Sequence, residues 1–508
     1  MPILNSIAFW WIKKRMHQIE LFIKYPNDIQ QETLRKIINS AKDTEWGKLY
    51  NFKNINNYEQ FKRNVPIQNY ESLKPYIDRI RRGEQNILWN TEIKLFAKSS
   101  GTTNDKSKFI PVSRESLEDC HYNGGRDMLA IYCSLYPDTK LFTGKNLGLG
   151  GSLATDNFGD YESQNGDLSA IVINNLPIWA EFFRSPDLSI ALMDNWDEKV
   201  EKLSKAIITE NMVSLAGVPS WMLLIMKRLL EITNKKSISE VWPNLEVYFH
   251  GGVNFAPYKE QFNTVFDKSD INYLELYNAS EGFFGIQDQR DSHDLLLMLD
   301  YGIYYEFIPF KELVDVDCKT LSLDEVKIGV TYALVISTNG GLWRYMLGDT
   351  IMFKSLYPFR FIINGRTKHF MNAFGEEIIV DNADKALGIA CEKTGAQIKE
   401  YTAAPVFMEG DEKGAHEWLI EFEIQPNSIA YFSEMLDNAL KSINSDYEAK
   451  RYQNLILKMP IIRSLPKDSF YKWFESKKKL GGQNKVPRLS NERKFLEELL
   501  ALIKSNSI

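Results

Sequence analysis

Short runs of β-branched and aromatic residues that end at glycine-containing turns recur between about residues 95 and 361. The run at 245–249, for example, ends at Gly251 and Gly252, and a helix-forming stretch at 221–233 precedes it. Strands that alternate with helices in this way are typical of layered α/β folds. The pattern therefore predicts an α/β architecture for the middle of the chain.

The pattern of residues differs near the C-terminal end of this region and on both sides of it. The stretches 302–310 and 329–337 predict a pair of strands in a small β subdomain. After residue 368 the pattern restarts, and a hairpin is predicted from 401–408 and 418–424. The first hundred residues favour helices instead.

A length of 508 residues exceeds what one hydrophobic core usually organises. We therefore predict a large N-terminal α/β domain over residues 1–367 and a smaller C-terminal α+β domain over residues 368–508.

Composition narrows the class of protein. A net charge of −6 gives no basic surface for nucleic acid. No apolar run reaches the roughly 20 residues of a membrane span, so we expect no integral membrane association. The apolar patch at 7–12 favours an amphipathic helix on the body of the protein, with a membrane-surface helix as the alternative. Scattered cysteines predict reduced thiols and a cytoplasmic location. They are Cys120, Cys133, Cys318 and Cys391.

A loop of small hydroxyl residues around one glycine follows the apolar run at 93–96. Backbone N–H groups and hydroxyls in such a loop can surround phosphate oxygens, although this segment alone is more often an ordinary polar turn. A Walker loop is disfavoured because its second glycine is missing. The loop contains Ser99, Ser100, Gly101, Thr102 and Thr103.

A glycine pair follows the run at 245–249. Gly251 and Gly252, before Val253, permit close approach of a flat ring such as adenine, whereas a plain turn is the simpler interpretation. His250 is more simply a structural histidine than a catalyst.

Two further turns carry carboxylates. Glu281 comes shortly after Tyr277 and suits Mg²⁺, which prefers one or two carboxylates together with phosphate. Asp349, behind Gly348, could accept both hydroxyls of a ribose. Arg366 follows a glycine and could reach a ribose or a phosphate.

Each signal is weak alone, but their order and spacing resemble the core motifs of the adenylate-forming superfamily, which includes acyl-CoA synthetases, luciferase and peptide-synthetase adenylation domains. Further details are similar to one branch, the auxin-responsive Gretchen Hagen family of acyl acid amido synthetases. The resemblance extends over nearly the whole chain. The segments that carry it are 41–48, 99–103, 280–285, 341–349 and 484–488.

The resemblance implies a large N-terminal adenylation domain, a mobile C-terminal domain, and use of ATP and Mg²⁺. Glu281 would carry the Mg²⁺ and act in catalysis together with Lys485. Domain closure would bring this lysine to the negative charge that develops on the α-phosphate. A solvated surface lysine is the alternative for Lys485. The implied nucleotide-binding residues are Ser99, Ser100, Gly101, Thr102, Thr103, Gly251, Gly252, Val253, Tyr277, Ser280, Asp349 and Arg366.

The implied activity is a two-step ligase that adenylates a carboxylic acid and then transfers the acyl group to an amine, in the first place an amino acid. Ser280 stands where plant members of the family usually carry a cysteine near this glutamate, which leaves the acceptor open. An acyl-CoA synthetase and a nucleotide-binding protein without turnover are the alternatives. The segments 122–132 and 147–153 are predicted to shape the acyl pocket. The sequence does not indicate the oligomeric state.

Overall fold

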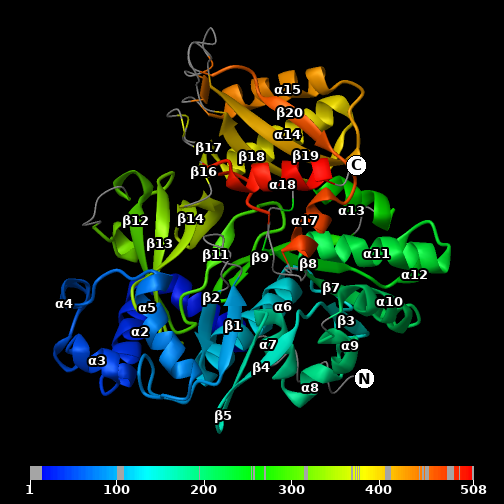
Figure 1. Cartoon of the computed structure of the whole chain (residues 1–508). Coiled ribbons are helices and arrows are strands. Elements are labelled where there is room, and N and C mark those ends of the chain that lie inside the picture. The colour runs from blue at the N-terminus through cyan, green and yellow to red at the C-terminus, as the bar shows by residue number, and fades with distance from the viewer. Residues whose placement is uncertain are drawn as a thin grey trace. The chain divides into compact units, whose positions relative to one another are not determined.

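The computed structural model forms two compact units (Figure 1). Unit 1 comprises Met1–Gly252 and Phe266–Ile362, and unit 2 comprises Val253–Val265 and Ile363–Ile508. The domain boundary between residues 367 and 368 stays a prediction. The structure describes residues 14–99, 108–193, 195–252, 255, 258–267, 271–313, 319–367, 370–371, 373, 376, 378–406, 414–444, 447–448, 451, 457–477, 486–490 and 492–505, without the side chains of 99, 178, 179, 196, 197, 220, 366, 370 and 505.

A mixed sheet, of 11 strands over the described residues, forms the centre of unit 1. Its order is β12-β13-β14-β15-β11-β10-β9-β8-β7-β3-β6. The strands from β6 to β9 run parallel, and β9, β10 and β11 pair antiparallel. The strands are β3 (Lys145–Gly148), β6 (Arg184–Ser185), β7 (Met212–Gly217), β8 (Val247–Gly251), β9 (Asn272–Ala279), β10 (Gly282–Gln287), β11 (Leu295–Leu297), β12 (Ile303–Pro309), β13 (Thr331–Thr338), β14 (Tyr345–Leu356) and β15 (Phe359–Arg366).

The strand pair predicted near 302–310 and 329–337 is confirmed as β12 and β13, which pair antiparallel. These strands continue one end of the large sheet, as Figure 1 shows. The predicted α/β architecture is also confirmed, because the parallel strands alternate with helices.

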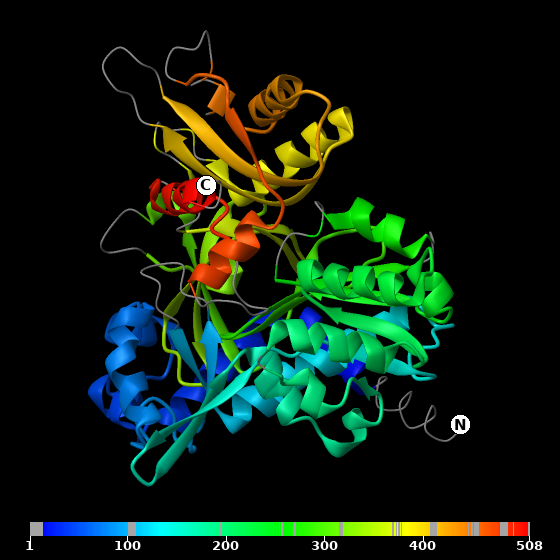
Figure 2. The same cartoon turned by 45° about the vertical axis from the view of Figure 1, so that its right-hand side comes forward.

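Side chains from both faces of the parallel region are covered. The ring of Tyr132 on α6 lies 5.5 Å from that of Phe249 on β8. Leu274 of β9 is the register partner of Phe249, so its neighbour Tyr273 points to the opposite face of the sheet. There the ring of Tyr273 lies 6.5 Å from that of Phe266. Figure 2 shows the helices between residues 196 and 233 along these strands. The helices are η2 (Ser116–Tyr122), α6 (Asn123–Leu135), α7 (Leu168–Asn174), α8 (Ile178–Glu181), α9 (Leu188–Ala191), α10 (Trp196–Ile207), α11 (Pro219–Thr233) and α12 (Ile238–Val241).

A smaller sheet and the N-terminal helices complete unit 1. The sheet has the order β2-β1-β5-β4, and β1 pairs antiparallel with β2 and parallel with β5. Residues 14–24 are helical, and the amphipathic helix predicted at the N-terminus otherwise lies outside the described residues. The elements are α2 (Pro26–Ala41), α3 (Glu45–Leu49), η1 (Phe52–Asn54), α4 (Tyr58–Asn64), α5 (Tyr70–Arg81), β1 (Leu95–Ser99), β2 (Lys108–Val112), β4 (Leu153–Phe158), β5 (Tyr161–Gly166), η4 (Phe310–Glu312) and η5 (Leu323–Glu325).

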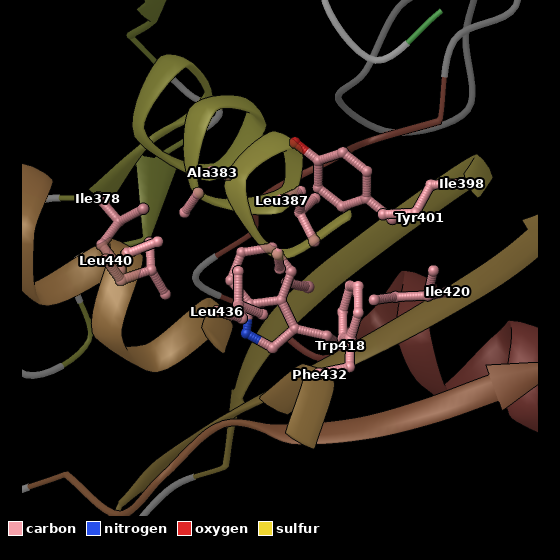
Figure 3. Close-up of a cluster of buried hydrophobic side chains, with 14 of the residues drawn as sticks. Ile378, Ala383, Leu387, Ile398, Tyr401, Trp418, Ile420, Phe432, Leu436 and Leu440 are labelled. Atoms are coloured by element: carbon pink, nitrogen blue, oxygen red, sulfur yellow. The ribbon is translucent and has the colours of Figure 1, made fainter. Parts of the chain in front are cut away.

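Unit 2 is built on a three-stranded sheet of order β18-β19-β20. The predicted hairpin is confirmed, because β18 and β19 pair antiparallel. Figure 3 shows side chains of α14 and α15, such as Leu387 and Leu436, lying near Trp418 of β19 in one buried cluster. The elements are α13 (Lys259–Phe266), whose last residue belongs to unit 1, β16 (Phe370–Met371), β17 (Ile378–Ile379), α14 (Val380–Thr394), β18 (Gln397–Val406), β19 (Ala415–Ile424), α15 (Ile429–Ile443), β20 (Ile461–Leu465), α17 (Ser469–Ser476) and α18 (Lys494–Ser505).

Candidate active site

A buried phenol–carboxylate pair joins two strands of the large sheet. The hydroxyl of Tyr277, on β9, donates a hydrogen bond of 2.5 Å to Oδ2 of Asp349, on β14. Both residues are buried. Three strands separate β9 from β14 in the sheet order, so the sheet curves enough to bring the two side chains together. The structure thus places two of the predicted nucleotide-binding residues in direct contact.

Asp349 lies in an irregularity of β14. Ala333 of β13 pairs with Thr350, and Val335 pairs with Met346, so a single residue of β13 stands opposite residues 347–349. Gly348 adopts φ +93°, a conformation that favours glycine. Such bulges redirect side chains next to functional sites. Asp349 was predicted at a strand end and instead lies within a strand, where the bulge gives it a separate orientation.

The ring of Tyr277 is enclosed by aromatic side chains. Its centroid lies 4.8 Å from that of Phe284 and 6.1 Å from that of Phe361. Gly285 makes room for this packing, because a Cβ at that position would stand 2.9 Å from the Phe361 ring. The ring therefore has little freedom to move, and its hydroxyl is held at one place.

Ser280 and Glu281 form the connection between β9 and β10. Ala279 pairs with Gly282, so the hairpin has a two-residue loop and Glu281 lies at its tip. Glu281 is partly exposed and Ser280 is buried. Among the described residues no group of three His, Cys, Asp or Glu could hold a metal ion. A single carboxylate fits Mg²⁺ that is bound mainly through phosphates and water.

The predicted adenine-binding turn follows β8. Gly251 pairs with Leu276, the residue before Tyr277, and a Cβ on Gly251 would stand 2.4 Å from the Leu276 carbonyl oxygen. Gly252 adopts φ +79°. Both positions therefore require glycine, and the turn lies beside Tyr277. Val253 lies outside the described residues. Burial lowers the pKa of His250 to about 3 and keeps the imidazole neutral, in agreement with a structural role.

The predicted phosphate loop lies largely outside the described residues, which omit Ser100, Gly101, Thr102 and Thr103. Ser99 ends β1, where its backbone pairs with Lys108 of β2. The far end of β2 is tied to the turn before β14, because Ser113 Oγ donates to the Asn339 carbonyl over 2.7 Å. The hairpin is thereby attached to the connection that leads into the strand of Asp349.

The remaining predicted residues belong to unit 2. Arg366 ends β15, and its side chain is not described, while Lys485 lies outside the described residues. The segment that follows Lys485 is held along β18: the Ala403 N–H donates to the Arg488 carbonyl over 2.8 Å. This pairing keeps residues 486–490 extended, so α18 begins only at Lys494.

The sequence analysis missed Glu275, two residues before Tyr277 on β9. Its register partner on β8 is His250, and its backbone N–H donates to Gln287 Oε1 over 2.9 Å. Burial raises the pKa of Glu275 to about 7. An isolated glutamate inside an apolar strand gave no motif, and only the pairing of β8 with β9 places it beside the Gly251 turn.

The segments predicted to shape an acyl pocket are the end of η2 with α6, and β3 with the loop after it. A Cβ on Gly125 or Gly148 would meet no atom of the described residues within 4 Å, so both segments have room beside a glycine in this part of the chain. Buried Lys199 supports the second segment: its Nζ donates to the carbonyls of Gly150 and Gly151 over 2.5 and 3.2 Å. Their role in acid binding stays a prediction.

Sequence comparison assigns the chain to a family. The GH3 family N-terminal domain matches residues 15–271, the central domain residues 296–366, and the C-terminal domain residues 381–494. These matches together cover most of the chain. The chain belongs to the GH3 family. This confirms the resemblance found in the sequence.

Curated GH3 proteins of plants are similar over much of their length. The indole-3-acetic acid-amido synthetase GH3.3 of Arabidopsis thaliana is 23% identical, over 96% of this chain and 93% of its own. The jasmonoyl–L-amino acid synthetase JAR4 of Nicotiana attenuata is 26% identical, over 67% of this chain and 69% of its own.

Solved structures share the fold. The AtGH3.15 acyl acid amido synthetase in complex with 2,4-DB superposes with a TM-score of 0.79 at 18% identity, over 96% of each chain. A 2-hydroxyisobutyryl-CoA ligase in complex with 2-HIB-AMP gives 0.59 at 12% identity, over 94% of this chain and 91% of its own. The GH3 fold of this chain is thus related to that of an adenylate-forming ligase. No helix that the structure places is long and apolar enough to cross a membrane.

Proposed function

We propose that this GH3 protein is an ATP-dependent ligase that converts a carboxylic acid to an acyl-adenylate and then transfers the acyl group to the amine of an amino acid. One observation carries the proposal. Tyr277 holds Asp349 and directly follows Leu276, the register partner of Gly251, and Glu281 lies at the tip of the hairpin that follows Tyr277. Support also comes from the curated relatives, which are named as amido synthetases.

Both steps are substitutions. A carboxylate oxygen of the acid attacks the α-phosphorus of ATP, the α–β phosphoanhydride bond breaks, and pyrophosphate leaves. The amine then attacks the acyl carbon, the bond from that carbon to the AMP oxygen breaks, and the amine loses a proton to solvent. No covalent bond to the enzyme is required, so the site needs groups that bind and orient rather than a nucleophile.

The residues of unit 1 supply nucleotide binding. Asp349 accepts hydrogen bonds from the ribose hydroxyls, which a carboxylate can do with both oxygens. The close-packed Gly251–Gly252 turn presents backbone to the adenine. Ser280 and the loop that begins at Ser99 contribute hydroxyl and N–H donors to the phosphates.

Glu281 is the residue that would hold Mg²⁺. The bound ion would supply positive charge next to the phosphate oxygens. The side chain at the tip of the hairpin is reachable, since Glu281 is partly exposed.

Arg366 and Lys485 complete the assignment in unit 2. Both can donate to phosphate oxygens, and Lys485 offsets the negative charge that builds on the α-phosphate during the first step. The segment 486–490, which follows Lys485, is extended and fixed along β18.

Pyrophosphate release with MgATP tests this function. A panel of carboxylic acids is supplied, each alone, with a mixture of amino acids, or with coenzyme A. We expect acid-dependent release that an amino acid accelerates, and loss of release in Glu281→Ala. The control is Glu312→Ala, an exposed glutamate in η4. Acceleration by coenzyme A alone would contradict amide synthesis, and absence of acid-dependent release would contradict adenylation.

A further inference from the structure

We infer that Tyr277 is a positioning residue whose hydroxyl fixes the Asp349 carboxylate, and that this contact makes the enzyme select nucleotides with an intact ribose diol. The inference rests on the proposed function, since it assumes that Asp349 binds the ribose. It adds a role for the phenol group itself, apart from the aromatic ring.

The contact is short and shielded. The hydroxyl donates to Oδ2 over 2.5 Å, and Tyr277 and Asp349 are each only 6% exposed. A hydrogen bond to a charged acceptor is stronger than one between neutral groups, and exclusion of water strengthens it further. The phenol therefore restricts the rotation of the carboxylate.

Asp349 needs such support because of its backbone. Residues 347–349 form the bulge of β14, so the regular pairing with β13 is interrupted on the N-terminal side of Asp349. The ladder resumes at Thr350, which pairs with Ala333. A side-chain contact from a different strand compensates for the irregular backbone at this point.

Tyr277 is a suitable support because its ring cannot shift. Phe284 lies 4.8 Å from it and Phe361 lies 6.1 Å away, measured between ring centroids. Gly285, the register partner of Tyr277 on β10, lets Phe361 approach. The hydroxyl is thus placed by packing, and the carboxylate is placed by the hydroxyl.

The phenol is also chemically suited to this task. It is neutral, so it orients Asp349 without cancelling the negative charge that attracts ribose hydroxyls. A carboxylate held in one rotamer matches a vicinal diol, whereas a rotating carboxylate accepts a single hydroxyl almost as well. Loss of the phenol should therefore reduce discrimination against deoxynucleotides more than it reduces binding itself.

Tyr305 offers a matched control. Its phenol is fully buried in the same sheet, its ring lies 6.3 Å from Phe284, and its hydroxyl donates to the Met298 carbonyl over 3.0 Å. Tyr305→Phe also removes a buried hydroxyl near Phe284. The hydrogen bond that it removes, however, does not involve Asp349.

The experiment measures kcat/KM for pyrophosphate release with ATP, 2′-deoxy-ATP and 3′-deoxy-ATP in the wild type and in Tyr277→Phe, Tyr305→Phe and Asp349→Ala. We expect Tyr277→Phe to lower kcat/KM for ATP about 10-fold and to lower the preference for ATP over both deoxynucleotides toward that of Asp349→Ala. Tyr305→Phe should keep the wild-type preference.

An unchanged preference in Tyr277→Phe, with Asp349→Ala impaired, would overturn this inference and leave the proposed function standing. An unchanged preference in Asp349→Ala would overturn the inference together with the ribose role of Asp349, whereas absence of acid-dependent release in the wild type would overturn the function itself. If Tyr277→Phe does not fold, Phe361→Leu loosens the ring and keeps the hydroxyl. A lower preference in that variant supports the inference, and a wild-type preference overturns it.

Discussion

Among the buried tyrosine–aspartate pairs of the described residues, Tyr277–Asp349 of unit 1 and Tyr401–Asp384 of unit 2 invite comparison. In unit 2 the Tyr401 hydroxyl donates to Asp384 Oδ1 over 2.7 Å, and Arg488 Nη1 lies 2.8 and 2.9 Å from the two Asp384 oxygens. In unit 1 Tyr277 donates to Asp349, which lies in a bulge of β14. The same donor–acceptor pair therefore stands in two different settings.

The difference teaches how one pair of residue types can serve stability or function. Arg488 neutralises Asp384 inside the core of unit 2, and burial raises the pKa of this carboxyl while the guanidinium opposes the rise. The Tyr277 phenol orients Asp349 without adding a charge. An aspartate that a buried arginine neutralises serves as an anchor, and the phenol that donates to Asp349 contributes no such neutralisation.

The largest expected effect is on activity, in unit 1. Asp349→Ala should lower kcat/KM for MgATP roughly 100-fold, because the ribose hydroxyls lose a charged acceptor. Initial rates of pyrophosphate release measure it. The matched change Asp384→Ala should lower the stability of unit 2 instead. If Asp349→Ala and Asp384→Ala were equally well folded and lost equal activity, the comparison would be wrong.

The next effect is on stability, in unit 2. Arg488→Met should lower the free energy of unfolding of unit 2 by about 3–5 kcal/mol, because it leaves buried Asp384 and half-buried Glu400 without their cation. Urea denaturation measures the change. Arg114, which is exposed and pairs with Glu118 on the same helical stretch, provides the control Arg114→Met, with no measurable change expected. A stable Arg488→Met variant would contradict the anchoring role.

A smaller effect separates the two phenols. Tyr401→Phe should cost about 1–2 kcal/mol of stability, since Asp384 keeps Arg488, and it should leave the preference for ATP over 2′-deoxy-ATP unchanged. Tyr277→Phe should change that preference. Thermal unfolding and the two nucleotide assays give both readouts. The comparison fails if Tyr401→Phe alters nucleotide preference as strongly as Tyr277→Phe.

The last effect depends on pH. Burial raises the pKa of Glu275 from 4.5 to about 7, so the folded protein binds this proton more tightly than the unfolded chain. The contribution of Glu275 to stability is therefore full below pH 4.5 and is lost as the pH rises toward 7. The free energy of unfolding of Glu275→Gln, relative to that of the wild type, should therefore rise by about 2 kcal/mol between pH 5.5 and pH 8.

Unfolding curves at the two pH values check this prediction. The control is Glu32→Gln, because Lys36 lowers the pKa of exposed Glu32, and its effect lies below pH 4.5. A difference between Glu275→Gln and the wild type that does not change with pH would show that Glu275 titrates normally.

Much of the fold could be predicted from the sequence because its local signals agree with one another. The β12–β13 pair and the β18–β19 hairpin were predicted from runs of β-forming residues. Helix α11 was predicted from the helix-forming stretch at 221–233. The candidate site residues were found because glycine turns and carboxylates follow strand-like runs in a fixed order.

The rest depends on tertiary geometry that no local pattern contains. The contact of Tyr277 with Asp349 requires the sheet to curve across three intervening strands, and the bulge at Gly348 is defined only by the pairing with β13. The raised pKa of Glu275 follows from its burial in the folded sheet. The extended conformation of residues 486–490 before α18 likewise depends on a long-range contact, their pairing with β18.

Isotope transfer tests the formation of an acyl-adenylate most directly. The acid that is most active in the pyrophosphate assay is labelled with ¹⁸O in its carboxylate and converted with MgATP and the preferred amino acid, and the products are analysed by mass spectrometry. Adenylation predicts AMP that carries one ¹⁸O atom, because the attacking carboxylate oxygen stays on the phosphorus when the amine displaces AMP. Label in inorganic phosphate, with ADP as the nucleotide product, would contradict adenylation and indicate an acyl-phosphate route.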